Sequence, residues 1–574
     1  MISGDFGDFN ELEQQLDTLY YNGVVYTADR DDRTAEAVGI RNGKIVFIGS
    51  NFEADKYKTT ASELINLEGK MVLPGFIDSH LHAPGRILTD LYNISLYEAF
   101  DVESILDKVK EFVRKHPDHS IIYGEGFSLG LFTGDEVSRG PGKERLDQVC
   151  SDRPIVLFSS DCHLAWLNSK AFELFGINEQ TPDPPGGIIE RDPISGKLWG
   201  TLKESAMQMI PEQQFTTEQI ERALVHFQQY LHSFGYTGIH SVSISAEPPL
   251  DSFHVMEKEG WLKLHVRSSV TIDPDKDLET QFDNLSKLKD RYSLDLHRVT
   301  TAKFFTDGVI EGATAFLSEP YEAGAGKKPG YRGEFLWDRK KLADAFKLAL
   351  DAGIQVHVHS IGDASTRLVL DALESAGPTE KIRRNRNSIT HLQLIDPSDI
   401  PRFKKLNVIA SVQPYWHCKE PGWWHNVDNY FLGHRAETEY PLQSFFNAGV
   451  IVASSSDHPV TAVPDPLRAL RAGITRNLTD EERYGLERIG TADDPPYLLN
   501  MKERATLPAM IKSLTVNGAY MLFTDDQTGT IEVGKWADLV ILDQNLFDLD
   551  PLDFGQARVI RTVFKGDTVF ISES

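Results

Sequence analysis

Short apolar runs that alternate with longer amphipathic stretches dominate the middle of the chain. The stretches between the runs carry apolar residues at helical spacing. Strands that alternate with helices indicate a parallel sheet. Eight strand-like runs lie at 71–77, 238–242, 262–270, 299–305, 354–358, 388–391, 408–412 and 450–454. Eight is the number that a (β/α)8 TIM barrel requires. We therefore expect an α/β fold of that class, with 84–230 as an insertion after the first strand.

Both ends of the chain show short strands joined by tight turns instead. Asn42-Gly43 is a strong hairpin signal, because both positions of a two-residue turn need positive φ. The strand-like runs lie at 19–27, 35–40 and 44–48 near one end, and within 529–542, at 559–564 and at 568–571 near the other. The predicted domains are an acidic lead-in at 1–17, a composite β-sandwich from 18–70 and 525–574, and the α/β barrel at 71–524.

The composition of the chain limits which binding partners and which cellular compartment we expect. The net charge of −26 argues against nucleic acid or an anionic membrane as a partner and favours a small-molecule substrate. Three cysteines form no disulfide framework, so we expect a reducing, cytoplasmic environment. The N-terminus lacks a basic segment followed by an apolar one, and no run of 18 apolar residues exists. The sequence thus predicts neither a signal peptide nor a membrane span.

Metal-binding side chains recur where the predicted barrel strands end, which is where barrel enzymes keep their active sites. His80 and His82 lie two residues apart, so both imidazoles point to the same side of a strand. Such a pair alone could also be one structural and one surface histidine. The joint pattern across several strands makes a metal site the better interpretation. Its members are His80, His82, Lys303, His359, His391 and Asp457, with His357 expected behind them.

Several phrases of the chain resemble the amidohydrolase superfamily, and more closely its family 3 branch, which includes N-substituted formamide deformylase and related amide hydrolases. The resemblance runs over nearly the whole chain. The phrases lie at 74–82, 163–169, 186–192, 303–308, 359–363, 413–414, 456–457 and 534–540.

The resemblance implies a binuclear centre with divalent metal ions. His80 and His82 would bind the more buried ion. His359 and His391 would bind the more exposed one. Zinc is the first choice, and manganese, iron and cobalt are alternatives because such ligands accept them as well. Lys303 would be carboxylated by CO₂, and its carbamate would bridge the ions. The alternative for Lys303 is a snorkelling or ion-paired lysine.

Asp457 is the expected catalytic residue. By the same resemblance it would contact the first ion and the bridging water. A divalent ion lowers the pKa of bound water from about 16 towards 7. Asp457 could then take the water's proton as a general base and pass it to the leaving nitrogen as a general acid. The alternative is a turn aspartate before Pro459.

Five side chains are candidate substrate contacts, namely His163, Trp166, Asp307, Trp416 and Trp423. His163 and Trp166 could instead only pack the insertion, and Asp307 could cap a turn. The other two lie in the loop at 415–425, which holds three of the eight tryptophans of the chain. That density suggests an apolar or aromatic substrate, or a lid. The alternatives are plain packing and a subunit contact in a homodimer.

These patterns together predict a metal-dependent hydrolase that cleaves an amide-like C–N bond other than a peptide bond, for example in an N-substituted formamide or an N-acyl amine. The same centre could instead open a cyclic amide or hydrolyse a carbamate or ester. A different class of function is a catalytically dead barrel that acts as a binding or regulatory protein. That hypothesis predicts a missing ligand, and none is missing here.

Overall fold

The computed structural model describes residues 15–99, 101–160, 164–184, 187–211, 213–244 and 247–573. The chain divides into two units, one formed by Met1–Ala83 with Phe227–Ser574 and the other by Pro84–His226. None of the helices within the described ranges combines the length and the apolar character that crossing a membrane requires.

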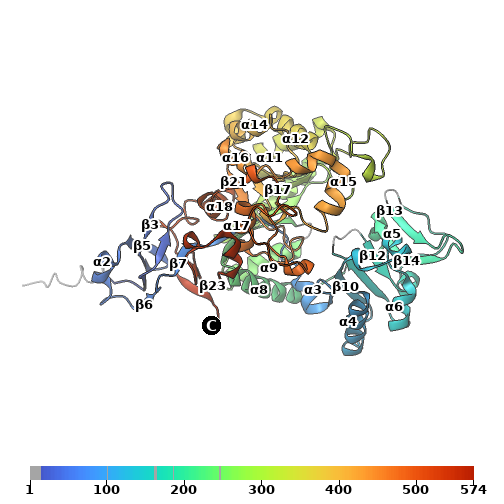
Figure 1. Cartoon of the computed structure of the whole chain (residues 1–574), viewed down its shortest axis with the longest axis horizontal. Helices are drawn as coiled ribbons and strands as arrows, with labels where there is room; N and C mark the ends of the chain where they lie inside the picture. The colour runs from blue at the N-terminus through green and yellow to red at the C-terminus, as the bar shows by residue number, and fades with distance from the viewer. Residues whose placement is uncertain are drawn as a thin grey trace, which may run out of the picture. The chain divides into compact units, whose positions relative to one another are not determined.

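Eight parallel strands form the centre of the first unit (Figure 1), and each is hydrogen-bonded to the next. Around the sheet they are β8 (Phe76–Leu81), β15 (Tyr236–Ile244), β16 (His265–Thr271), β17 (His297–Phe305), β18 (Gln355–Ser360), β19 (Ser388–His391), β20 (Ile409–Val412) and β21 (Val452–Ser454). The predicted (β/α)8 barrel is confirmed.

The two edges of this sheet meet just beyond β21. The Asp457 N–H donates to the His80 carbonyl at 2.8 Å, and the His82 N–H donates to the His458 carbonyl at 2.9 Å. These two backbone hydrogen bonds join the first barrel strand to the chain that leaves the last one. The seam therefore runs directly through the candidate metal ligands.

Helices with one apolar face cover the barrel strands. In α11 (Arg339–Asp351) the Asp338 side chain accepts from the Lys341 N–H and caps the helix. Buried residues of α11 recur at helical spacing, and Phe346 meets Phe304 of β17 with ring centroids 5.0 Å apart. The other helices include α9 (Glu247–Lys258), α10 (Leu278–Arg291), α12 (Asp363–Ala376), α14 (Ile400–Leu406), α16 (Leu442–Asn447), α17 (Pro466–Thr475), α18 (Leu507–Ser513) and α19 (Val516–Met521).

The apolar run that we predicted as one barrel strand at 71–77 is two strands in two sheets. β7 (Met71–Pro74) pairs with β2 (Val24–Tyr26) and β22 (Leu539–Leu542), whereas Phe76 begins the barrel strand β8. The chain changes sheet at Gly75, where a Cβ atom would lie 2.3 Å from Oγ1 of Thr237. Only glycine allows this approach, so the single-strand prediction was wrong for a reason that lies far away in the sequence.

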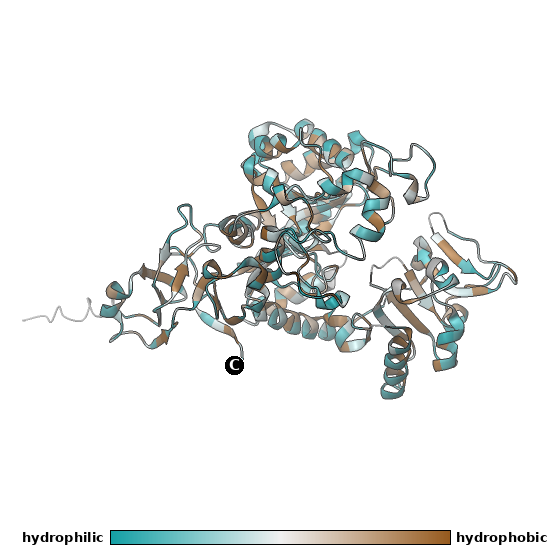
Figure 2. Ribbon diagram, in the orientation of Figure 1, coloured by the Kyte–Doolittle hydropathy of each residue, from teal (hydrophilic) through white to brown (hydrophobic). Residues whose placement is uncertain are grey.

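Strands from both ends of the chain build two further sheets whose facing side chains share one core. Tyr20 and Val38 of one sheet are buried with Val72, Leu539 and Val563 of the other. Figure 2 colours these strands mainly brown, as expected for buried apolar side chains. The first sheet is β5 (Lys44–Gly49), β4 (Ala37–Arg41), β1 (Thr18–Tyr21) and β6 (Glu63–Asn66). The second is β24 (Asp567–Ile571), β23 (Val559–Phe564), β22, β7, β2 and β3 (Thr34–Ala35).

The hairpin predicted at Asn42-Gly43 is confirmed. β4 and β5 pair antiparallel across it, and the two turn residues have φ angles of 52° and 73°.

The Pro84–His226 unit has its own mixed sheet and its own core. Helix α4 (Val102–Lys115) packs its buried Ile105 and Val109 into a cluster with Leu157 and Trp166. The sheet order is β13 (Gly187–Arg191), β14 (Leu198–Glu204), β12 (Leu164–Leu167), β11 (Ile155–Ser159), β10 (Ile122–Phe127) and β9 (Ile94–Ser95).

A buried hydrogen bond ties the barrel to the C-terminal strands. Nε2 of His265 on β16 lies 2.8 Å from Oδ2 of Asp538, and Oδ1 of Asp538 accepts from the Lys565 N–H at 2.7 Å. Burial raises the pKa of Asp538, but the charge and hydrogen bond of His265 and the other donors outweigh burial and hold it below its usual value. Asp538 thus stabilises the fold above the pKa that it has when unfolded. This stabilisation is lost as pH falls through the lower folded pKa.

We expect Asp538→Ala to lower the free energy of unfolding by about 3–5 kcal/mol at neutral pH, because it leaves His265 buried without its partner. Urea unfolding followed by circular dichroism measures this. Asp567→Asn is the matched control. Its side chain is 73% exposed in a 3.6 Å pair with Lys263, and such surface pairs contribute about 0–1 kcal/mol. Equal stability of the two variants would contradict the structural role of Asp538.

Candidate metal centre

The six predicted ligands come from strand ends or from the residues just beyond them. His80 lies on β8, Lys303 on β17, His359 on β18 and His391 at the end of β19. His82 and Asp457 follow β8 and β21 and lie at the seam described above. All are buried except His82, whose side chain is 36% exposed.

Asp457 is the point at which the two sides of the seam meet. Its Oδ1 lies 3.1 Å from Nε2 of His80 and 3.1 Å from Nε2 of His82. One donor atom each from His80, His391 and Asp457 lie within 4.8 Å of one another, close enough to hold a single ion. Asp457 and His391 have φ angles of 56° and 77°, which non-glycine residues adopt only at an energetic cost.

The non-ligating nitrogen of His391 has a fixed partner. Nδ1 of His391 lies 3.0 Å from Oε1 of Gln413, whose Nε2 donates to Thr390 at 3.1 Å and to Ser455 at 2.7 Å. The side-chain amide of Gln413 therefore directs its oxygen towards His391. Nδ1 of His391 carries the proton, and its Nε2 keeps a lone pair for a ligand role.

His80 and His359 are oriented in similar ways. Nδ1 of His80 lies 2.7 Å from Nε2 of His357, whose own Nδ1 lies 2.7 Å from Oγ of Ser388. Nε2 of His359 lies 3.3 Å from the Gly308 carbonyl, which can only accept, so Nδ1 of His359 presents the lone pair. Burial lowers the pKa of His80 and His357 well below the usual value and that of His359 to about 4. These imidazoles are neutral at pH 7, as metal binding requires.

Lys303 is fully buried, and its Nζ makes no hydrogen bond within the described part of the chain. Burial lowers the pKa of Lys303 to about 7, although the charge of Asp457 acts in the opposite direction. An unpaired amine in an apolar position is costly. The four imidazoles, the carboxylate and this amine are a donor set that fits a divalent metal centre with a carboxylated lysine.

The pKa of Asp457 is lowered even though its side chain is buried. Burial raises the pKa of Asp457, but the hydrogen bond to His82 and the neighbouring imidazoles and Lys303 outweigh that effect. Asp457 is therefore a carboxylate at neutral pH, which is the form that binds a metal ion and accepts a proton.

The candidate substrate contacts lie in different environments. Trp416 lies nearly parallel to His391, with ring centroids 5.7 Å apart. Asp307 is buried and accepts from the N–H groups of Phe316, Ile361 and Gly362, so its oxygens hold the loops after β17 and β18. Trp423 is 47% exposed.

The two candidates from the insertion are placed differently. Trp166 is fully buried in the core of the Pro84–His226 unit, where its indole N–H donates to the Gly142 carbonyl at 3.0 Å. His163 lies outside the described residues.

Some residues around the centre were not singled out from the sequence. Asp78 is buried two residues before His80 and accepts from the N–H groups of His80 and Ser456. Burial raises the pKa of Asp78 to about 7. Phe305 follows Lys303 by two residues on β17, and its ring centroid lies 5.3 Å from that of His359. The even spacing along each strand was the available signal for both.

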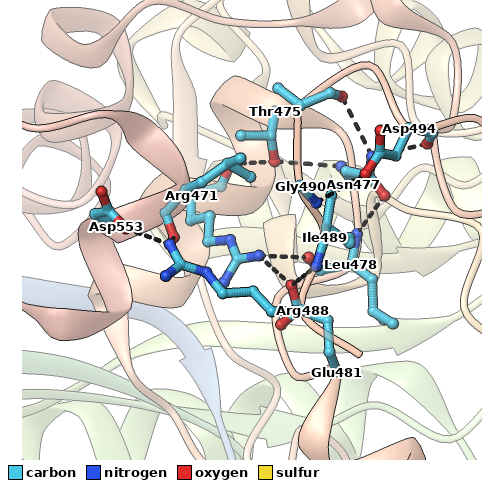
Figure 3. Close-up of polar contacts among 12 residues, drawn as sticks. Arg471, Thr475, Asn477, Leu478, Glu481, Arg488, Ile489, Gly490, Asp494 and Asp553 are labelled. Atoms are coloured by element: carbon cyan, nitrogen blue, oxygen red, sulfur yellow. Dashed lines mark hydrogen bonds and ion pairs between the residues drawn. The ribbon is translucent and has the colours of Figure 1, made fainter. Parts of the chain in front are cut away.

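The segment that follows α17 forms two hydrogen bonds with the tryptophan-rich loop at 415–425. The Lys419 N–H donates to the Tyr497 carbonyl at 2.8 Å, and Nε2 of His425 lies 2.8 Å from the Pro496 carbonyl. Figure 3 shows how that segment is anchored. Arg471 of α17 pairs with Glu481, while Arg488 pairs with Asp553. The loop that carries Trp416 is thus held by polar contacts to a segment that is anchored by a buried pair, Arg471 and Glu481, and by a more exposed pair, Arg488 and Asp553.

Comparison with known proteins identifies the family. The model of the amidohydrolase family matches residues 63–570. N-substituted formamide deformylase of Arthrobacter pascens is 25% identical over 572 residues, which are 97% of this chain and 98% of that protein. The exoenzymes regulatory protein AepA of Pectobacterium carotovorum is 32% identical over 410 residues, 70% of this chain and 85% of that protein.

A solved structure supports the same assignment. An uncharacterized metal-dependent hydrolase from Pyrococcus furiosus superimposes with a TM-score of 0.70 at 26% identity, covering 93% of this chain and 99% of that one. The family match extends over most of the chain, including all the strands that carry the centre. The chain therefore belongs to the amidohydrolase family and is a metal-dependent hydrolase of that family.

Proposed function

We propose that this protein hydrolyses a C–N bond in a small amide, such as an N-substituted formamide or an N-acyl amine, at a centre of two divalent metal ions with zinc as the first candidate. The observation that carries the proposal is the seam, where donor atoms of His80, His391 and Asp457 lie within 4.8 Å of one another and Nε2 of His82 lies 3.1 Å from Asp457. The likeness to N-substituted formamide deformylase supports the amide as the substrate class.

The residues divide into two sets. His80, His82 and Asp457 would hold one ion, and His359 and His391 the other. The carbamate of Lys303 would bridge them, formed when the neutral amine adds to CO₂ with release of one proton. The low pKa of the buried Lys303 favours the neutral amine that this addition needs.

Bound divalent ions supply an electrophile for the amide carbonyl and lower the pKa of water towards 7. Asp457 accepts the proton of that water at a carboxylate oxygen. It then donates the proton to the leaving nitrogen, so that an amine departs instead of an amide anion. Gln413 and His357 hold the tautomers of His391 and His80 throughout.

Two other functions remain alternatives. The same centre could act on a cyclic amide, a carbamate or an ester, because the attack at a carbonyl is the same. A regulatory role without catalysis is suggested by the name of the relative AepA. The complete set of ligand side chains favours the enzyme.

Metal content and a substrate panel test the proposal. We expect close to two transition-metal ions per chain by elemental analysis, with hydrolysis of formamides or acyl anilides faster than of lactams or esters. Asp457→Asn should lower kcat by about 10²–10⁴-fold, because the proton carrier is lost. A protein that binds no metal, and shows no hydrolysis after addition of zinc or manganese with bicarbonate, would refute the proposal.

Lys303→Met tests the bridge. We expect the metal content to fall towards one ion per chain and kcat/KM to fall by at least about 10³-fold, because the anionic bridge is absent. The melting temperature of the metal-free protein should not fall, since a thioether replaces an amine that has no partner among the described residues at a fully buried position. Retention of two ions and of activity would remove Lys303 from the centre.

Gln413→Leu tests the orientation of His391. The variant removes the acceptor for Nδ1, and we expect the affinity for one of the two ions to fall by about 10–100-fold. Competition with a chelator measures this without any activity assay. Gln443→Leu is the control, because the Gln443 amide bonds only to Asn447 along its own helix at an exposed position. Equal affinities in both variants would argue against the orienting role.

A further inference from the structure

Four rings lie in a continuous row across the candidate metal centre. Ring centroids are 5.3 Å apart between Phe305 and His359, 4.6 Å between His359 and His391, and 5.7 Å between His391 and Trp416. The planes of the last pair differ by 16°. We call these residues the aromatic row. Its two inner members are the proposed ligands of the more exposed ion, and its two outer members are carbon rings without a ligand role.

Phe305 is positioned directly beyond Lys303. The two residues are two apart at the end of β17, so their side chains point to the same side of the strand. Nζ of Lys303 lies 4.9 Å from the Phe305 ring centroid. Lys303 is fully buried, yet Phe305 is 37% exposed. Trp337 fixes its backbone by donating its indole N–H to the Phe305 carbonyl at 2.9 Å. An apolar ring is thus held partly open to solvent at the mouth of the barrel.

Trp416 stands at the other end of the row. It ends the short helix Pro414–Trp416 after β20. Its indole N–H donates to Oγ1 of Thr461 at 3.0 Å, which satisfies its only polar atom. The rest of the indole is an apolar surface that lies against His391. The supported loop described above holds this ring in place.

We propose that Phe305 and Trp416 determine specificity for amides that carry a planar aromatic group beside the scissile bond. The inference rests on the proposed function, because the carbonyl of such a substrate would lie at the ion held by His359 and His391. Its aromatic group would then lie beside one of the two outer rings of the row, Phe305 or Trp416. Aromatic pairs contribute about 0.5–1.5 kcal/mol beyond buried area, so a saturated ring of similar size gains less.

Binding of two hydroxamic acids to the metal-loaded protein tests this. Both probes chelate the metal, and they differ in the ring, which is flat in benzohydroxamic acid and saturated in cyclohexanecarbohydroxamic acid. Titration calorimetry should show tighter binding of the flat probe. The variant that removes the ring beside the probe, Phe305→Leu or Trp416→Leu, should weaken the flat probe by roughly two- to tenfold and the saturated probe by less than about twofold. Trp416→Phe keeps a ring and should retain the preference.

Two exposed residues outside the row provide matched controls. Phe52 is 86% exposed and Trp261 is 52% exposed. Phe52→Leu and Trp261→Leu should leave the affinities for both probes unchanged. The melting temperature of every variant shows whether the fold is intact.

The outcomes separate this inference from the proposed function. Equal affinity for both probes in the wild type, or equal weakening of both probes in the variants, would overturn the specificity role. Amide hydrolysis by the same preparation would then leave the proposed function standing. A preference for the flat probe that depends on Phe305 or on Trp416, without hydrolysis of any amide, would support the aromatic row and overturn the proposed function alone.

Discussion

The closure of the barrel between β8 and the chain beyond β21 is the constraint on which the centre depends. Two backbone hydrogen bonds, from Asp457 to His80 and from His82 to His458, make this seam. The same residues supply three of the proposed ligands. A backbone with φ of 56° at Asp457 costs energy, and the seam holds it there. The closed barrel therefore places these candidate ligands beside one another.

Burial of the polar side chains of this centre costs free energy of folding when no metal ion is bound. His80, His391 and Lys303 are buried, and burial lowers their pKa values. Hydrogen bonds to His357 and Gln413 satisfy one nitrogen each of His80 and His391, which leaves the other nitrogen for a metal. Metal binding would therefore add directly to the stability of the fold, since the unfolded chain has no preformed site.

Sequence patterns predicted the barrel correctly, because strand order and strand ends follow from the order of residues along the chain. The same strand ends suggested the candidate ligands, which remain a prediction. His80, Lys303 and His359 were found by reading strand ends. The sheet change at Gly75 was missed, because its cause is a contact with Thr237 on another strand. The orienting role of Gln413 and the position of Phe305 beside His359 depend on distances between strands, which spacing along one strand does not contain.

The fold alone does not decide between an enzyme and a regulatory protein, because one fold hosts many functions. Lys303 provides a physical argument. A fully buried amine without a hydrogen-bond partner among the described residues destabilises the native state. A barrel that had lost catalysis would become more stable by replacing it with an apolar residue, and most such substitutions would be tolerated. The buried amine would be compatible with stability if it were carboxylated and served as an anionic metal ligand, as proposed above. The presence of Lys303, together with every proposed partner, therefore favours a working hydrolytic centre.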